Sequence, residues 1–261
     1  LDNVDFAVPS GEIHALVGEN GAGKSTLMKV LSGALKPDSG TMSIDGADYR
    51  PTDPLQARRQ GVVMIYQELS LAPHLTVAEN IFLGIEKTRR SLLAKSAMHN
   101  AAKTALAELE HPEIDPNTRV GTLTIAERQI VEIARALAVQ CRVLVLDEPT
   151  TGLDSAAAVA IMRFIKSLAV AHGLCVVCTI HQPSIAVFEC FDKTLMLAEG
   201  RTAYYGPASE MEAHFTGLGH QRPEVTNPAE FVLDLISRDL SSTAAVSELL
   251  NAWQRKAPTI S

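Results

Sequence analysis

Short apolar runs and longer helical stripes of apolar residues alternate along this chain of 261 residues. A run of four to eight mostly apolar residues that ends in polar or turn-forming residues predicts a buried strand. Such strands are predicted at 13–17, 62–67, 143–150 and 174–180. Hairpins are expected at 41–46 and 194–206, which contain the pairs Asp45-Gly46 and Glu199-Gly200. The run 143–150 is apolar enough to lie inside a parallel sheet covered on both faces.

The segment from Thr76 to Gln140 changes to helical spacing, in which apolar residues three and four apart share one face. Two stripes are formed by Met98, Ala102, Ala105 and Leu109, and by Ile130, Ile133, Ala134 and Leu137. A third follows Asp154 and consists of Ile161, Phe164, Ile165 and Leu168. We therefore expect a helical insert at 76–140 within an α/β chain, and further helices after residue 206.

A glycine-rich loop, GENGAGKST, lies between the first predicted strand and a helical segment that ends at Gly33. It fits the pattern G-x-x-x-x-G-K-[ST], whose inward-pointing N–H groups and following helix suit phosphate oxygens. Lys24 would reach the β- and γ-phosphates, and the Ser25 hydroxyl would hold Mg²⁺. The chain is thus predicted to bind a nucleoside triphosphate through Gly18, Glu19, Asn20, Gly21, Ala22, Gly23, Lys24, Ser25 and Thr26.

Two carboxylates, Asp147 and Glu148, follow the apolar residues of the strand at 143–150. The C-terminal ends of strands in open α/β sheets are the usual place for ligand-binding groups. Asp147 can bind the Mg²⁺ of the nucleotide, and Glu148 can act as general base on an attacking water.

Composition excludes several other classes. A net charge of −7 without a basic stripe argues against nucleic-acid binding. The N-terminus has no signal-peptide pattern, and four cysteines in a chain of this length do not form a disulfide scaffold. Cys175 and Cys178 should face opposite sides of their strand, which favours a core position over a redox or metal site.

The motifs and their order along the chain resemble those of the nucleotide-binding domain of an ABC transporter. Walker A corresponds to Gly18–Thr26, the Q-loop glutamine to Gln67, the signature to LTIAERQ at 123–129, Walker B to Val143–Asp147 with Glu148, the D-loop aspartate to Asp154 and the switch histidine to His181. The resemblance implies a P-loop NTPase fold, with a mostly parallel sheet, a small antiparallel β subdomain and a helical insert. It also implies a RecA-like core at 1–75 and 141–206, a signature subdomain at 76–140, and a C-terminal helical segment at 207–261 leading toward a membrane domain.

The resemblance gives these residues their expected roles. Gln67 would sense Mg²⁺ and the lytic water, completing a metal set with Ser25 and Asp147. His181 would bond the γ-phosphate and orient the water. Thr124 and the helix it opens would contact the γ-phosphate of a second nucleotide-binding domain, so that two domains sandwich two ATP molecules, and Asp154 would also contact nucleotide. A transmembrane domain, of the same or a partner polypeptide, would place the chain at the cytoplasmic face of a membrane.

The sequence departs from the family in two places. The usual signature LSGGQ is replaced at 123–127, where Ala126 takes the place of a glycine and Glu127 adds a negative charge. This change should affect turnover more than binding. The aromatic residue that stacks on adenine is expected upstream of Leu1.

The two halves resemble different subfamilies. GENGAGKSTLMKVLSG and MIYQELSLAPHLTVAENIFLG resemble ATPases of bacterial monosaccharide importers. TIHQPS, LAEGRTAYYGP and NPAEFVLDLIS resemble the White/pleiotropic-drug-resistance type, the G subfamily. We favour a G-type exporter whose natural polypeptide continues past Ser261 into membrane spans. The alternatives are a monosaccharide importer, a soluble ABC ATPase acting on ribosomes or DNA, and a binding-only regulatory domain.

Overall fold

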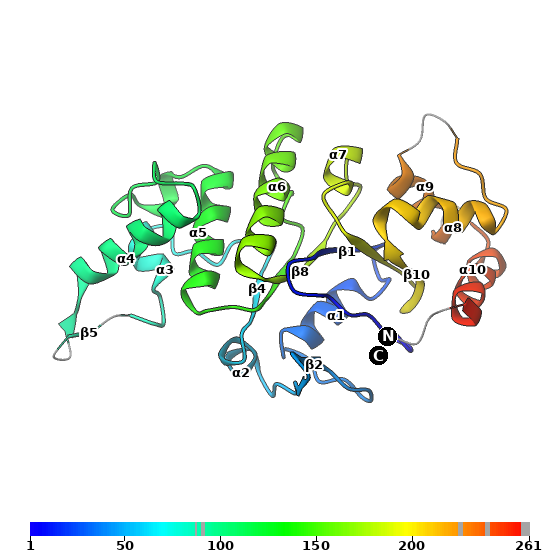
Figure 1. Cartoon of the computed structure of the whole chain (residues 1–261), viewed down its shortest axis with the longest axis horizontal. Helices are drawn as coiled ribbons and strands as arrows, with labels where there is room; N and C mark the ends of the chain where they lie inside the picture. Colours follow the sequence, from blue (N-terminus) through cyan, green and yellow to red (C-terminus); the bar gives the residue numbers. More distant parts are fainter. Residues whose placement is uncertain (87, 90–91, 224–226, 238–240, 257–261) are drawn as a thin grey trace.

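A six-stranded sheet forms the centre of the computed structural model, which describes residues 1–86, 88–89, 92–223, 227–237 and 241–256 (Figure 1). Its strand order is β10-β9-β1-β8-β7-β4. The strands are β1 (Ile13–Gly18), β4 (Val62–Ile65), β7 (Val143–Leu146), β8 (Cys175–Thr179), β9 (Lys193–Ala198) and β10 (Arg201–Pro207). All neighbours pair in parallel except β9 with β10, which confirms the predicted mostly parallel sheet. β7 lies inside the sheet, as expected, and ends just before the two carboxylates.

The central strands are apolar because both faces of the sheet are covered. In β7, Leu144 and Leu146 belong to one buried cluster and Val145 to the other. In β8, Cys178 faces the first cluster and Val177 the second. Helix α6 (Ser155–His172) lies above the sheet in Figure 1, whereas α1 (Lys24–Leu31) and α2 (Pro54–Arg59) lie below it. All four cysteines are free thiols, and burial raises the pKa of Cys178.

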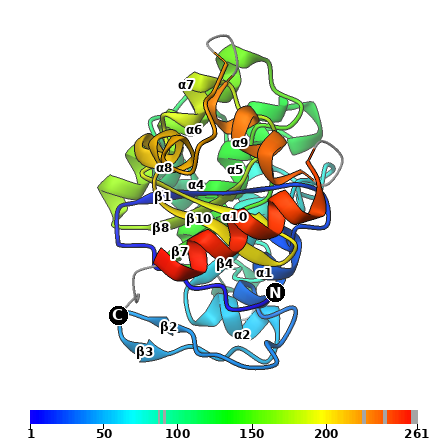
Figure 2. The same cartoon turned by 90° about the vertical axis from the view of Figure 1, so that its right-hand side faces the viewer.

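Both predicted hairpins are present. β2 (Ser43–Ile44) pairs with β3 (Ala47–Asp48) in a small antiparallel unit, visible at the bottom of Figure 2. The turn residues Asp45 and Gly46 both have positive φ, 51° and 75°, which matches the right-handed twist of the two strands. The same rule applies to the turn between β9 and β10, where Glu199 and Gly200 have φ of 54° and 76°.

A helical group occupies one end of the molecule (Figure 1). It contains α3 (Val77–Ile81), α4 (Lys95–Glu108), the 3₁₀ turn η1 (Val120–Thr122) and α5 (Ile125–Ala138). The helical pattern did not predict a short antiparallel pair, β5 (Thr88–Arg89) and β6 (Leu92–Leu93), which precedes the first periodic apolar residue of α4. Within α4 the fully buried face uses Leu106, while Ala105 is only half-buried.

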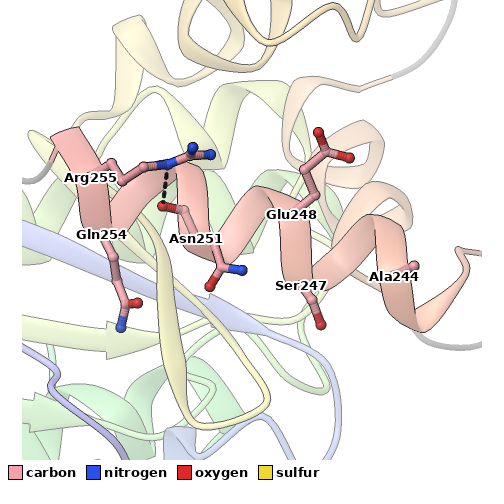
Figure 3. A pocket seen from close by; sticks show the side chains of 6 residues that line it. All are labelled: Ala244, Ser247, Glu248, Asn251, Gln254 and Arg255. Atoms are coloured by element: carbon pink, nitrogen blue, oxygen red, sulfur yellow. Dashed lines mark hydrogen bonds between the residues drawn. The ribbon is translucent and has the colours of Figure 1, made fainter.

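The C-terminal residues cover the opposite edge of the sheet. They form the 3₁₀ turn η2 (Ala208–Glu210), α8 (Met211–Gly217), α9 (Pro228–Ile236) and α10 (Thr243–Lys256). The short helix α7 (Ile185–Phe188) comes earlier in the chain, between β8 and β9, and packs against α6 and α9. Trp253 of α10 lies 5.4 Å from the ring of Tyr204 and 5.5 Å from that of His214, so α10 covers the edge strand β10 (Figure 2). Its outer face is mostly polar, as Figure 3 shows for Ser247, Glu248, Asn251, Gln254 and Arg255.

Helix α6 is the only described helix with the length and mean hydropathy, 1.3, of a membrane span. Its residues Ile161, Met162 and Ile165 are buried in the core. Lys166, on the same helix, pairs with Asp192 at 2.5 Å. These contacts identify α6 as a helix that covers the sheet.

Candidate active site

The C-terminal ends of three parallel strands, β1, β7 and β8, lie side by side at one end of the sheet. We call this end of the sheet the shared strand edge, and it brings separate parts of the sequence together. The register pairs Leu16 of β1 with Thr179 of β8, and Leu146 of β7 with Cys178. The glycine-rich loop after β1, the carboxylates after β7 and His181 after β8 therefore share one edge. This is the position at which open α/β sheets bind their ligands.

The glycine-rich loop has no room for a side chain at its first position. A Cβ on Gly18 would lie 2.4 Å from the carbonyl oxygen of Leu197 on the neighbouring strand β9. The loop ends at Gly23, which is the N-cap of α1 and offers that helix no side-chain cap. Lys24 donates hydrogen bonds to the carbonyl oxygens of Gly18, at 2.6 Å, and Glu19, at 3.0 Å. The ammonium group thus lies against the loop, while Ser25 is exposed at the start of the helix.

A threonine that sequence analysis missed fixes the Asp147 carboxylate and the backbone of Glu148. The Thr179 hydroxyl donates to Oδ1 of Asp147 at 2.7 Å and accepts the backbone N–H of Glu148 at 2.9 Å. Thr179 is 1% exposed, so this link is shielded from water. Thr151, also missed, donates its hydroxyl to Oε2 of Glu148 at 3.0 Å. The available signal was Thr179's place at the end of the strand next to β7.

Glu148 has a backbone φ of 47°, a left-handed conformation that non-glycine residues rarely adopt. Such conformations persist only where neighbouring contacts impose them, and they concentrate at functional sites. Those contacts are the hydrogen bond that the Glu148 N–H donates to Thr179 and the one that the Glu148 carboxylate accepts from Thr151. They fix both the backbone and the carboxylate of this residue.

Lys24 of the glycine-rich loop interacts electrostatically with the carboxylates of Asp147 and Glu148. Burial lowers the pKa of Lys24, and the charges of Glu148, Asp147 and Glu19 act in the opposite direction. A partly desolvated ammonium beside carboxylates has few water molecules to lose when an anion binds. The arrangement can therefore bind a polyphosphate with Lys24 while the carboxylates face a metal ion or water.

Gln67 and His181 flank this centre. Gln67 is exposed two residues beyond β4, whose Ile65 carbonyl accepts the backbone N–H of Asp147 at 2.9 Å. His181 is exposed two residues beyond Thr179. Both residues therefore leave strands that adjoin the carboxylates. The structure brings them to the same edge as Lys24, Asp147 and Glu148.

Thr124 and Asp154 lie outside this group and use their side chains as helix caps. Asp154 accepts the backbone N–H of Ala157 at 2.9 Å and starts α6. Thr124 starts α5, and its hydroxyl donates to Oε2 of Glu127 at 2.7 Å. The backbone N–H of Glu127 returns a bond of 3.3 Å to that hydroxyl. The predicted helix start is thus present, with its hydroxyl engaged inside the same chain.

The donor set suits a nucleotide with Mg²⁺ better than a metal held by protein alone. Among the described residues there is no cluster of three or more histidines, cysteines, aspartates or glutamates that could hold a metal. Mg²⁺ commonly takes one or two carboxylates and completes its shell with phosphate oxygens and water. Asp147, with one oxygen bonded by Thr179, and the Ser25 hydroxyl fit this requirement.

Comparison with known proteins identifies the family. The sequence profile described as ABC transporter matches residues 1–151, more than half of the chain. The chain belongs to the ABC transporter family. It is an ATP-binding domain of that family. A second profile, described as ABC-2 type transporter, matches residues 181–255.

Similar curated proteins are named as import ATP-binding proteins. A ribose import ATP-binding protein of Burkholderia cenocepacia is 46% identical over 211 residues, covering 79% of this chain and 40% of that protein. A putative ribose/galactose/methyl galactoside import ATP-binding protein of Agrobacterium fabrum is 43% identical, covering 82% and 42%. The chain therefore spans about two fifths of the length of these relatives.

Solved structures agree on the fold. An ATP-binding cassette of an ABC transporter in its ADP conformation superposes with a TM-score of 0.71 at 24% identity, covering 84% of this chain and 91% of that one. The cbiO1 protein of Clostridium perfringens, part of an ABC transporter complex, gives 0.69 at 25% identity, covering 83% and 85%. The ABC ATPase fold inferred from the motifs is confirmed.

Proposed function

We propose that this chain hydrolyses Mg²⁺-bound ATP at the shared strand edge. The observation that carries the proposal is the Thr179 link, because one buried hydroxyl holds the Asp147 carboxylate and the backbone of Glu148, two residues whose charges act on Lys24. Lys24 and the backbone of residues 18–26 would hold the phosphates. Ser25, Asp147 and Gln67 would hold Mg²⁺, which supplies charge neutralisation at the phosphates when bound.

Glu148 is the proposed general base. Its carboxylate is fixed through Thr151 and its backbone through Thr179, so it can accept the proton of an attacking water without first reorganising. His181 would bond the γ-phosphate and orient that water. Thr124 and Asp154 would act across a dimer, on the nucleotide of a second ATP-binding domain. This assignment keeps 76–140 as the signature subdomain, between core segments 1–75 and 141–206.

The test of hydrolysis is Glu148→Gln, which keeps the size and hydrogen bonding of the side chain and removes the base. Hydrolysis should fall by about 10²–10⁴-fold while ATP still binds. Glu110→Gln is the matched control, since Glu110 is also a glutamate with positive φ, 62°, but lies in the helical group. Phosphate release and ATP binding are measured for both. Unchanged turnover in Glu148→Gln would assign the proton transfer to another group.

For the transport step we propose import of a monosaccharide. Support comes from relatives named for import of ribose and of ribose, galactose or methyl galactoside, at 46% and 43% identity. These relatives favour the importer alternative over the G-type exporter preferred from the sequence. The second candidate is the G-type exporter, because the ABC-2 type transporter profile matches residues 181–255, where the motifs that resemble the G subfamily lie. In both cases residues 207–261 would lead toward a membrane domain, and the chain would act at the cytoplasmic face.

The direction of transport can be tested with inverted membrane vesicles that contain the natural transporter, with ATP added outside. Import predicts ATP-dependent loss of preloaded labelled ribose. Export predicts accumulation of a labelled substrate inside the vesicles. Glu148→Gln should abolish whichever movement occurs.

A further inference from the structure

The loop that carries His181 is strained at its next residue. Gln182 has a backbone φ of 43°, within the left-handed region that non-glycine residues rarely adopt. It is followed by Pro183, and a residue before proline is pushed toward extended conformations. The side chain of Gln182 and the proline that follows it thus both disfavour this positive-φ conformation. Such a conformation persists only where the surrounding structure imposes it.

Anchors lie on both sides of the strained residue. On the strand side, Thr179 is bonded to Asp147 and Glu148. On the other side, Pro183 is buried and its carbonyl oxygen accepts a hydrogen bond of 2.5 Å from Nδ2 of Asn227. His181 and Gln182 are exposed and span the stretch between these two anchors. The position of the His181 backbone is therefore set from two directions.

Asn227 uses the two ends of its amide for two tasks. Its Oδ1 accepts the backbone N–H of Ala229 at 3.0 Å and caps α9, while its Nδ2 bonds Pro183. Helix α9 packs against α7, which begins directly after the strained loop at Ser184. The donor is thus held in place by a helix rather than by a free loop. The ABC-2 type match, residues 181–255, contains both ends of the bond.

We propose that Asn227 is a positioning residue for His181, acting through the Pro183 carbonyl to hold the Gln182 turn. The proposal rests on the proposed ATPase function for its catalytic consequence. It gives the NPAEF segment a task within this chain, the fixing of a loop at the nucleotide site. A cap that served only α9 would need the Oδ1 acceptor and would have no need of Nδ2.

Substitutions at Asn227 separate the two tasks. Asn227→Ser and Asn227→Asp keep a good cap acceptor, but neither can donate to Pro183 as the amide does. Because a misplacement of about 1 Å can cost about 10²-fold in rate, we expect kcat to fall about tenfold in both, with the KM for ATP within about twofold of the original value. Asn251→Asp is the matched control, since Asn251 is an asparagine of α10 that accepts from Arg201 through Oδ1. It should leave kcat unchanged.

Two further measurements distinguish positioning from loss of structure. In a His181→Ala background, Asn227→Ser should have no additional effect on kcat, because the group it positions is gone. Gln182→Gly should restore most of the kcat lost in Asn227→Ser, because glycine adopts positive φ without strain. Hydrogen exchange of the backbone amides of residues 182, 184 and 185 should be faster in Asn227→Ser, with exchange within α9 unchanged.

An unchanged kcat in Asn227→Ser, or a loss that adds to that of His181→Ala, would overturn the proposal. Unchanged exchange at residues 182, 184 and 185 would overturn it as well, and this readout does not depend on catalysis. If hydrolysis proved independent of Glu148 and His181, the proposed function would fail separately. The exchange data would still decide whether Asn227 holds the loop.

Discussion

The N-termini of helices α1 and α5 differ in whether an acidic side chain of the chain itself caps them. Helix α1 begins at Gly23 without a side-chain cap, and no acidic residue lies in its first turn. Helix α5 begins with a complete capping box, in which Thr124 and Glu127 bond each other's backbone N–H. The first helix leaves its N–H groups to an anion from outside, whereas the second supplies its own carboxylate.

This difference sets the expected order of binding. An anion at α1 meets free N–H groups and the Lys24 ammonium, so its site is formed within one chain. A phosphate at α5 would have to share the Thr124 hydroxyl with Glu127 or displace its carboxylate, 2.7 Å away. ATP should therefore bind first at α1, and closure of a dimer over α5 should be the weaker step.

The largest effect is expected at α1. Lys24→Ala removes the cation beside the loop, and a hydrogen bond to a charged group contributes about 1.5–3 kcal/mol, so the affinity for ATP should fall about 10–150-fold. Equilibrium binding of a fluorescent ATP analogue measures this. Lys29→Ala is the control, because Lys29 is exposed in the last turn of the same helix. Equal losses in the two variants would show that general positive charge, rather than the Lys24 contact, holds the nucleotide.

The pH dependence of binding gives the next effect. Burial lowers the pKa of Lys24, so its ammonium is lost at a lower pH than that of an ordinary lysine. Affinity for ATP should therefore fall as pH rises through this lowered pKa, below 10.5. The free energy of unfolding should change in the opposite direction. Below the folded pKa, burial of the charged ammonium lowers the stability of the fold, and this cost disappears as pH rises above the unfolded pKa. Titration calorimetry and thermal unfolding across pH 7–10.5 would test these opposite trends, which Lys24→Met should remove.

The α1 end could be predicted from sequence because its chemistry lies in one short stretch. Spacing alone placed Lys24 and Ser25 after a strand, and apolar runs placed Asp147 and Glu148 at a strand end. The links through Thr179 and Thr151 could not be predicted, because they depend on the register of β7 with β8 and on the turn after Glu148. The contact of Asn227 with Pro183, 44 residues apart, required the packed position of α9.

At the N-terminus of α5, the sequence allows two interpretations of Glu127. The negative charge of Glu127 predicts repulsion of a phosphate, and the sequence pattern T-x-x-E is also that of a capping box. The structure shows that the Glu127 carboxylate accepts the backbone N–H of Thr124 within the chain. The same side chain therefore stabilises the start of α5 and repels a phosphate that approaches it. The repulsion acts only when a second domain brings its phosphate to the N-terminus of α5.

A smaller effect is therefore expected from Glu127→Gln. Glutamine can keep the capping box while removing the charge, so folding stability should change little. In a Glu148→Gln background with ATP, repulsion of about 1 kcal/mol between exposed charges corresponds to roughly fivefold tighter dimerisation. Analytical ultracentrifugation measures the dimer constant. The control is Glu79→Gln, which changes the equivalent glutamate of the Thr76 capping box on α3. Tightening in both variants would reflect net charge and remove the role assigned to Glu127.

The smallest effect compares the two capping boxes themselves. Thr76→Ala and Thr124→Ala each remove an N-cap, which costs about 1 kcal/mol and should lower the melting temperature by about 2–4 °C. Only Thr124→Ala should also weaken the ATP-dependent dimer. The hydrogen bond from the Thr76 N–H lowers the pKa of Glu79, so its contribution is present above the unfolded value of 4.5 and is lost as pH falls through the folded value. Alanine keeps this N–H but loses the Thr76 hydroxyl, whose own hydrogen bond to the Glu79 carboxylate also lowers that pKa. The deficit of Thr76→Ala should therefore shrink on acidification. Thermal unfolding at several pH values tests this, and a deficit that stays constant down to pH 3 would mean that the hydroxyl stabilises the helix only by accepting the Glu79 N–H.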